Sequence, residues 1–146
     1  MTFLLDVNVL IALVDPQHAA HDSAHRWFEE EGRADWATCP LTENGIVRIV
    51  TQPSYKNFLA SPAEALKLLS TLCRLGNHRF WPDSISLLDA AIIHPAKLAT
   101  SDQITDTYLL ALAVANHGRL ATLDRRLSPV AVAGGPAALH LVPVTA

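Results

Sequence analysis

The sequence predicts a single α/β domain, in which a short and mainly parallel β-sheet is flanked by helices on both faces. Short apolar strands alternate with helical stretches along the 146 residues, and such alternation favours right-handed crossovers between parallel strands. The composition agrees, because 50% of the residues are hydrophobic and 17% are charged. Apolar runs stay well below the ~20 residues of a membrane-spanning helix. We therefore expect residues 1–146 to form one globular domain without a membrane segment.

The N-terminal half is expected to contain two strands and three helices. Residues 3–5 form an apolar strand, and Asp6 then opens a helix that continues to about Val14, before the breaker Asp15-Pro16. The remaining elements of this half are a helix at 22–31, a strand at 36–39, and a helix from Pro40 to about Thr51 that Gln52-Pro53 ends.

The C-terminal half contains the clearest helix start of the chain, at residues 61–64. Ser61 can cap the helix, Pro62 suits the first turn, and Glu64 can reach back to the cap. Gly76 lies where this helix is expected to end. The other elements expected here are a strand at 80–81, a short helix at 87–93, a long helix from Asp106 to His117 stopped at Gly118, a strand at 119–123 and, after the turn Gly134-Gly135-Pro136, a strand at 139–144.

Four acids lie at or near the carboxyl ends of the expected strands. Asp6 interrupts an apolar run, where a buried and unpaired carboxylate would cost several kcal/mol. Glu43 begins the helix after the second strand, and Asp124 follows a later strand. Asp106 opens a helix whose preceding loop can reach the same edge. Because the active sites of parallel α/β sheets lie beyond the carboxyl ends of the strands, we expect the four acids to converge.

Helical spacing and charge both bear on this convergence. Glu43 and Asp106 each head a stripe of apolar residues at plus three, four and seven, which places them at the rim of the core. Two carboxylates roughly 5 Å apart repel by about 3 kcal/mol at an effective dielectric constant of 20. Four acids on one edge therefore require protons or a cation, although each acid taken singly could be a helix cap or a turn residue.

The donor atoms indicate which metal and which chemistry to expect. Carboxylate oxygens suit Mg²⁺ or Mn²⁺ rather than zinc, and such an ion can polarise a phosphoryl oxygen and generate hydroxide at neutral pH. The formal net charge of −3 argues against a protein that coats nucleic acid by bulk positive charge, but not against nucleic acid as a substrate. The basic candidates for phosphate contact are Arg26, Arg48, Lys56, Arg79, Arg125 and Arg126.

The N-terminus and the cysteines bear on the cellular compartment. The apolar residues after Met1 lack a basic segment and a small-residue cleavage site, and Asp6 lies where the apolar core of a signal peptide would be. Cys39 and Cys73 form neither a disulfide framework nor a zinc quartet. We therefore expect a cytoplasmic protein.

Three segments resemble the PIN-domain ribonucleases: LLDVNVLIAL at 4–13, TENGIVRIVTQP at 42–53 and TDTYLLALAVANHGRLATLD at 105–124. The resemblance covers nearly the whole chain and is strongest to the VapC toxins of bacterial toxin-antitoxin modules. It implies a Mg²⁺-dependent endoribonuclease, with Mn²⁺ as a possible substitute, in which a metal-activated water attacks the RNA phosphodiester. It also implies a homodimer that a VapB-like antitoxin inhibits.

The resemblance assigns roles to the four acids. Asp6 and Asp106 would be the principal metal ligands. Glu43 would orient metal-bound water, and Asp124 would bind a second metal or position water. Asp102 is an alternative to Asp106, and we choose Asp106 because the long apolar helix starts directly after it.

Two further residues are expected to support the ligands. Asn8 would hold a ligand by hydrogen bonding, two residues after Asp6, and Thr122 could act similarly beside Asp124.

A phosphatase is the strongest competing enzyme hypothesis. The segment Asp6-Val7-Asn8-Val9 resembles the strand-end motif of haloacid-dehalogenase-like phosphatases, and Lys97 with Asp102 and Asp106 could mimic their later lysine and acids. The second acid of that motif would here be Asn8, which cannot exchange protons as a carboxyl group does. This interpretation also leaves two of the four acids unused.

A zinc site and a catalytically inert binding module are further hypotheses. His18, His21 and His25 invite the zinc interpretation, because His21 and His25 lie one helical turn apart. Asp22, however, stands where the metalloprotease signature has Glu, and the pair has no evident third ligand, so packing and hydrogen bonding around Trp27 is the simpler explanation. A binding module would give no reason to collect carboxylates at strand ends.

Overall fold

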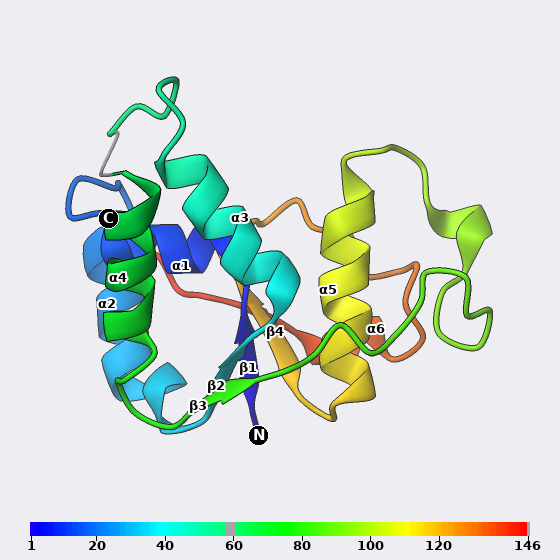
Figure 1. Cartoon of the computed structure of the whole chain (residues 1–146). Helices are drawn as coiled ribbons and strands as arrows, with labels where there is room; N and C mark the ends of the chain where they lie inside the picture. The colour runs from blue at the N-terminus through cyan, green and yellow to red at the C-terminus, as the bar shows by residue number, and fades with distance from the viewer. Residues whose placement is uncertain (58–60, 146) are drawn as a thin grey trace.

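The computed structural model describes residues 1–57 and 61–145, and its centre is a five-stranded sheet in the order β3-β2-β1-β4-β5 (Figure 1). Every neighbouring pair of strands is parallel. The elements are β1 (Phe3–Leu5), α1 (Val7–Val14), α2 (His21–Glu30), the 3-10 turn η1 (Gly32–Ala34), β2 (Trp36–Thr38), α3 (Pro40–Val50), α4 (Pro62–Leu72), β3 (His78–Phe80), the 3-10 turn η2 (Pro95–Lys97), α5 (Gln103–Ala115), β4 (Arg119–Thr122), α6 (Gly135–Ala138) and β5 (Leu139–Leu141).

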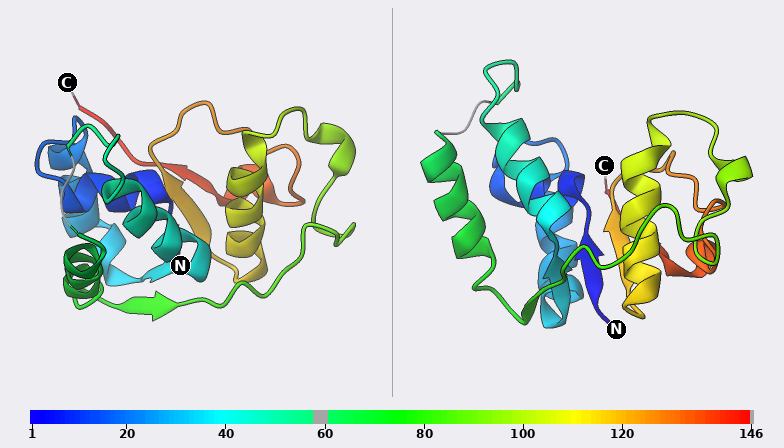
Figure 2. Two further views of the ribbon diagram at one scale, coloured as in Figure 1. Left: turned by 45° about the horizontal axis from the view of Figure 1, so that its top comes forward. Right: turned by 45° about the vertical axis from the view of Figure 1, so that its right-hand side comes forward.

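Helices cover both faces of the sheet, as the sequence predicts. Helices α1 to α4 pack on one face, while α5 and α6 pack on the other (Figure 2). Neighbouring residues of β1 point to opposite sides, so that Leu5 joins the core under α1 to α4 and Leu4 joins the core under α5. Such strands need to be apolar on both faces. None of the described helices has the length and apolar character to cross a bilayer.

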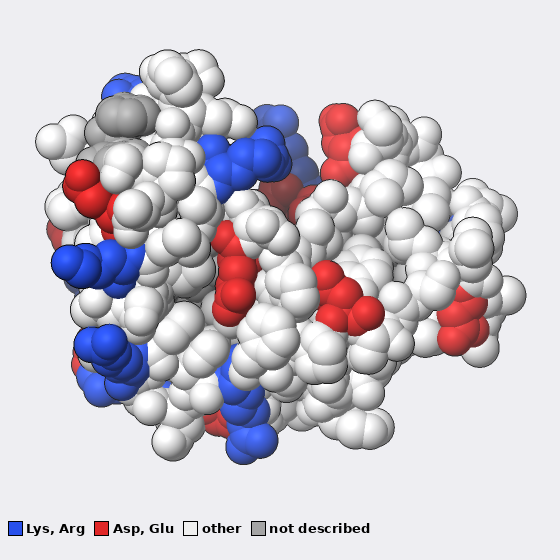
Figure 3. All heavy atoms as spheres, viewed as in Figure 1, with Lys and Arg blue, Asp and Glu red and all other residues white. Residues whose placement is uncertain are grey.

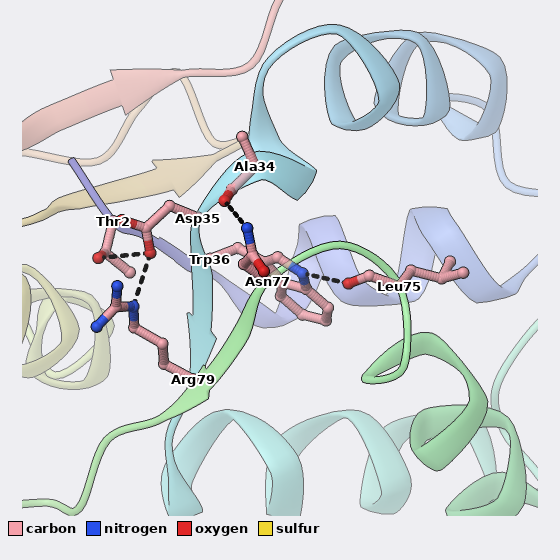
Figure 4. A network of polar contacts seen from close by, with 7 residues as sticks. All are labelled: Thr2, Ala34, Asp35, Trp36, Leu75, Asn77 and Arg79. Atoms are coloured by element: carbon pink, nitrogen blue, oxygen red, sulfur yellow. Dashed lines mark hydrogen bonds and ion pairs between the residues drawn. The ribbon is translucent and has the colours of Figure 1, made fainter.

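Polar contacts join the amino-terminal ends of β1, β2 and β3 (Figure 4). The Asp35 carboxylate accepts a hydrogen bond from the Thr2 hydroxyl at 2.8 Å and pairs with Arg79 at 2.9 Å. The indole Nε1 of the buried Trp36 donates to the Leu75 carbonyl at 2.9 Å. These contacts fix the starts of β1, β2 and β3 relative to one another.

Most element boundaries agree with the sequence prediction to within a few residues. Asp6 caps α1, and Ser61 caps α4 by accepting a hydrogen bond from the Glu64 amide at 3.3 Å. The third strand lies at His78–Phe80 rather than at 80–81.

The prediction of a short helix at 87–93 is wrong. This segment forms turns, and Ile93 pairs with Val132 in an isolated antiparallel bridge. The backbone of the segment bonds to the later loop, since the His94 amide donates to the Ala131 carbonyl at 2.8 Å and the Ala133 amide donates to the Ile92 carbonyl at 2.9 Å. Long-range pairing therefore replaces the local helix.

Helix α5 begins at Gln103, three residues before the expected start. The Oε1 atom of Gln103 accepts hydrogen bonds from the Ala99 and Thr100 amides, at 2.7 and 3.1 Å, and so closes the preceding turn. Asp106 therefore lies within the first part of the helix and is not its cap. Of the expected turn Gly134-Gly135-Pro136, only Gly134, with φ +75°, precedes the short helix α6, which already includes Gly135 and Pro136.

The three N-terminal histidines bind backbone groups. The His21 and His25 rings hydrogen-bond the Ala12 and Leu13 carbonyls at 2.7 and 2.8 Å, and His18 Nδ1 accepts from the Ala20 amide. These contacts satisfy carbonyls at the end of α1 that have no partner within the helix. His21 and His25 thereby have a structural role at the end of α1.

A buried acid directly after α1 joins that helix to the segment after α3. Asp15 is fully buried and accepts hydrogen bonds from the Tyr55 hydroxyl at 2.5 Å, the Asn57 amide group at 2.8 Å and the Gln17 backbone at 2.9 Å. Burial by itself would raise the pKa of Asp15, but these donors outweigh it and the pKa is lowered from 3.8.

The substitution Asp15→Asn is expected to lower the free energy of unfolding by about 2 to 3 kcal/mol at pH 7, because charge-assisted hydrogen bonds are lost. A lowered native pKa gives stability that is present above the unfolded-state pKa, near 3.8, and that is lost as the pH falls below it. Urea unfolding at several pH values tests this. The gap between wild type and variant should shrink below pH 3.8, and a gap independent of pH would contradict it.

Candidate functional site

The carboxyl ends of β1 and β4 place two of the expected acids side by side. The two strands are parallel neighbours, and the Asp6 amide continues their pairing by donating to the Ala121 carbonyl at 2.9 Å. The chain turns into helix α1 directly after Asp6, and β4 ends two residues before Asp124. Both carboxylates are thereby brought to one edge of the sheet.

The Asp6 carboxylate is 5% exposed and is held at both oxygens. Its Oδ1 accepts the Val7 amide at 2.7 Å, which is the capping bond of α1. Its Oδ2 accepts the hydroxyl of the fully buried Thr122 at 2.8 Å and lies 3.4 Å from Nδ2 of Asn8. The partners of Asp6 in the described structure are therefore neutral donors.

Asn8 and Thr122 also fix the turn that carries Asp124. Asn8 Oδ1 accepts the Leu123 amide at 3.0 Å, and Asn8 Nδ2 donates to the Thr122 hydroxyl at 3.1 Å. The Asp124 amide donates to the same hydroxyl oxygen at 3.1 Å. Asn8 and Thr122 thus lie where the sequence analysis expected supporting residues, and Thr122 contacts both the acid on β1 and the turn after β4.

Asp106 approaches this pair from helix α5. Burial raises its pKa to about 6, and the charges of Asp6 and Asp124 act in the same direction. Burial also raises the pKa of Asp6 above 3.8, with the charge of Asp124 as a further cause, although the hydrogen bonds from Thr122 and Val7 oppose the rise. The three aspartates are therefore close enough to sense one another's charge.

Two hollows open on either side of Asp106. The first, which we call the α3 hollow, has a volume of about 380 Å³ and is lined by apolar side chains of α1 and α3 together with Asp6, Asn8, Asn44, Arg48 and Asp106. The second, which we call the loop hollow, has a volume of about 350 Å³ and is lined by polar residues that include Asp102, Gln103, Asp106, Asp124, Arg126 and Ser128. Figure 3 shows acidic and basic side chains gathered around the depression between α3 and α5.

Glu43 is the expected acid that the structure does not bring to the other three. Its Oε2 accepts the Thr38 hydroxyl at 2.7 Å, and that hydroxyl oxygen is also 2.7 Å from Nε2 of His78. The charge of Glu43 acts on His78 and on Cys73, whose pKa values are shifted chiefly by burial. Glu43 thus lies near the end of β2, within reach of the charges of His78 and Cys73, and it lines neither hollow.

Asn44 and Arg48 line the α3 hollow. Arg48 is one of the basic residues expected to contact phosphate, whereas no pattern in the sequence indicates Asn44 by itself. They are four residues apart and so share one face of α3. Gly45 is the signal that could have indicated this face, because glycine inside a helix lowers helix stability. A Cβ atom at Gly45 would lie 2.7 Å from Cγ2 of Val7, so the glycine lets α3 approach α1 closely.

The three aspartates fit a hard divalent cation that keeps water ligands. Within residues 1–57 and 61–145, no three His, Cys, Asp or Glu side chains are close enough to hold an ion by themselves. Mg²⁺ is commonly bound by one or two carboxylates with waters completing its shell. The mutual repulsion of Asp6, Asp106 and Asp124 is the property that a cation would relieve.

Comparison with known proteins identifies the family. The model of the PIN domain matches residues 3–133. The chain belongs to the PIN domain family. Among curated relatives of this PIN domain, ribonuclease VapC44 and ribonuclease VapC39 of Mycobacterium tuberculosis are each 42% identical over 134 residues. The alignments cover 92% of this chain and 94% and 96% of those proteins, respectively.

Solved structures support the same fold at much lower identity. VapC20 of Mycobacterium tuberculosis, a toxin that cleaves the sarcin-ricin loop, aligns with a TM-score of 0.62 at 12% identity over 90% of this chain and 96% of its own. VapBC2 from Rickettsia felis, solved with a DNA fragment from its promoter, aligns with a TM-score of 0.55 at 9% identity over 97% and 98% of the two chains.

The substitution Asp106→Asn is expected to stabilise the metal-free protein at pH 8 by on the order of 1 kcal/mol, allowing for solvent screening of this half-buried group. A raised native pKa in an acid costs stability as the pH rises from 3.8 to about 6, and asparagine escapes this cost. Thermal unfolding in chelator should show the gain at pH 8 but not at pH 3.5. The exposed Asp22→Asn is the control, and equal behaviour of the two variants would contradict the repulsion.

Proposed function

We propose that this PIN domain is a VapC-type endoribonuclease toxin that hydrolyses RNA phosphodiester bonds with Mg²⁺, for which Mn²⁺ can substitute. The observation that carries the proposal is the buried Asp6 carboxylate, bound by Thr122 and Asn8 and facing the charges of Asp106 and Asp124. The ribonuclease relatives at 42% identity support RNA as the substrate.

Asp6, Asp106 and Asp124 would hold the ion. A bound divalent ion supplies positive charge that polarises a phosphoryl oxygen and lowers the pKa of water. Thr122, Asn8 and the Val7 amide orient Asp6 so that its carboxylate does not have to reorganise when substrate arrives.

Asp124 and Asp106 come from two other elements, the turn after β4 and helix α5. The turn at 122–124 is fixed by its bonds to Asn8 and Thr122, so Asp124 keeps its place relative to Asp6. Asp106 lies near the N-terminus of α5, where the helix dipole favours a carboxylate. In this arrangement Asp124 positions water on the side of the loop hollow. Asp106 lines both hollows and so contributes its carboxylate on either side.

For Glu43 we propose a positioning role. Its bond to Thr38 joins the start of α3 to the end of β2, and thereby sets the orientation of the face that carries Asn44 and Arg48. Glu43 lines neither hollow, whereas each of the three aspartates lines at least one of them. The geometry therefore favours a site made of three aspartates.

The phosphatase hypothesis receives less support. Its general acid position is Asn8, whose side chain is engaged with Leu123 and Thr122. Its lysine would be Lys97, an exposed residue of η2 that lines neither hollow. Trapping of an acylphosphate on Asp6 would restore this hypothesis, and intact RNA after incubation of purified, partner-free protein with Mg²⁺ or Mn²⁺ would favour an inert binding module.

The proposed partners are RNA, a VapB-like antitoxin and a second copy of the chain. The paired name VapBC2 of one structural neighbour supports a toxin that works with an antitoxin. Co-expression with the product of an adjacent short reading frame should suppress RNA cleavage. Light scattering during size exclusion should give twice the chain mass of 15.8 kDa, whereas a mass of one chain would contradict the homodimer.

Asp6→Asn is expected to lower RNA cleavage about a thousandfold, because several kcal/mol of charge stabilisation are removed. Circular dichroism should show the fold retained, since asparagine can still accept the capping bond. Glu43→Gln is the comparison, with less than about a tenfold loss expected from a positioning role. Wild-type activity in Asp6→Asn would contradict the proposed metal ligand, and a thousandfold loss in Glu43→Gln would contradict the site of three aspartates.

Mg²⁺ or Mn²⁺ is expected to raise the melting temperature of the wild-type protein, because an ion bound only by the native state stabilises it by about 2.7 kcal/mol at 100 times its dissociation constant. Differential scanning calorimetry with and without chelator measures the shift. The double variant Asp6→Asn, Asp106→Asn should lose it. An equal shift in wild type and double variant would place the ion elsewhere.

A further inference from the structure

We infer that the two hollows beside Asp106 are subsites for the two nucleotides that flank the cleaved phosphate, with Arg48 and Arg126 each binding the phosphate on its own side. This inference rests on the proposed ribonuclease function. It adds the path of the RNA across the site, and it selects Arg48 and Arg126 from the six basic candidates and assigns each to one side of the cleaved phosphate.

The shared wall of the two hollows locates the cleaved bond. Asp106 lines both hollows, Asp6 lines the α3 hollow and Asp124 lines the loop hollow. A phosphate that reaches all three carboxylates through a cation must therefore lie where the hollows meet. The sugar and base on each side of it then enter opposite hollows, whose volumes of about 380 and 350 Å³ are in the range of sites for small molecules.

The α3 hollow has the chemistry of a site for one base. Apolar side chains of α1 and α3 form part of its wall, including Ile11, Leu41 and Ile49. A base can bury its flat face against such a wall, and the exposed Asn44 offers an amide that can both donate and accept. Arg48 lies one helical turn beyond Asn44 on the same face.

The loop hollow is polar and carries the second arginine. Gln103 has its Oε1 atom occupied by the Ala99 and Thr100 amides, which leaves its NH₂ group as a donor. The Arg126 amide donates to Asp124 Oδ1 at 2.8 Å, so that backbone contact fixes Arg126 beside the acid. Phosphate and sugar oxygens match these donors.

The two guanidinium groups are available for phosphate. Arg48 and Arg126 are exposed, and neither pairs with an acid among the residues that the structure describes. The adjacent Arg125 differs, because its side chain donates to the Val142 carbonyl at 3.3 Å and it lines neither hollow. On a chain of net charge −3, one arginine in each of the two hollows that share Asp106 supplies local attraction where RNA must approach.

Neutral linkages in a short RNA test the assignment. After mapping of a wild-type cut, the RNA is synthesised with a methylphosphonate replacing the phosphate one linkage 5′ or one linkage 3′ of the cut. Arg48→Ala and Arg126→Ala are each expected to lower kcat/KM on the unmodified RNA about tenfold to a hundredfold, as for loss of a charge-assisted phosphate contact. In each variant, one of the two neutral linkages should no longer lower kcat/KM, because the arginine that contacts that phosphate is already gone. This linkage should differ between the two variants.

Controls separate substrate binding from structure. Arg125→Ala removes the same charge next to Arg126 and should remain sensitive to both neutral linkages, as wild type is. Arg48→Lys and Arg126→Lys should recover part of kcat/KM, because lysine retains the charge but not the two-pronged contact. The Arg48 and Arg126 variants should unfold at the wild-type temperature, since both arginines are exposed.

The outcomes distinguish this inference from the proposed function. One contrary outcome is that the wild type cleaves the RNA while both arginine variants lose sensitivity to the same neutral linkage, and another is that they lose it to neither. Either result would overturn the two subsites and leave the proposed ribonuclease function standing. Equal losses in Arg125→Ala and Arg126→Ala would do the same, since bulk charge would then suffice. Absence of RNA cleavage by wild type with Mg²⁺ and Mn²⁺ would overturn the proposed function and the subsites together.

Discussion

The hydrogen bond from Thr122 to Asp6 is the contact on which the site depends. It joins the ends of β1 and β4, and the same hydroxyl oxygen accepts from Asn8 and from the Asp124 amide. A buried carboxylate without such donors would take up a proton or force the segment apart. With them, Asp6 stays in place although burial and Asp124 both raise its pKa. The packing of two apolar strands thereby determines where the charged group lies.

The sequence predicts the sheet and the position of Asp6, Asp106 and Asp124 near one another, because the patterns that indicate the strand ends and helix α5 are local. The segments Phe3-Leu4-Leu5 before Asp6 and Leu120-Ala121-Thr122-Leu123 before Asp124 indicate the ends of β1 and β4, and parallel pairing then brings Asp6 and Asp124 together. Helix α5 begins at Gln103 and not at Asp106, so the expected helix start is wrong. The apolar stripe that Asp106 heads nevertheless predicts its place at the rim of the core.

The position of Glu43 could not be predicted from the helical period of α3. Its stripe does face the core, because Ile46 and Val50 are buried. The face of α3 that borders the hollow with Asp6 and Asp106 is a different one, and it carries Asn44. Neighbouring residues of a helix, such as Glu43 and Asn44, are separated by a rotation of about 100°. A helical period alone cannot decide between these faces, since the choice depends on how closely α3 approaches α1. The loop segment at 87–93 escaped prediction for a related reason, because its partner lies about forty residues away in sequence.

Helix α1 is held at both ends and surrounded along its length. Asp6 caps one end, the Ala12 and Leu13 carbonyls at the other end are bound by histidines, and Asp15 follows with three donors of its own. Five of the eight residues of α1 are buried. Its amide protons should therefore exchange with solvent only through opening of the whole domain. The acid at its start belongs to the last part of the molecule to open, so local fluctuations of the surrounding loops leave the first ligand of the proposed metal site in place.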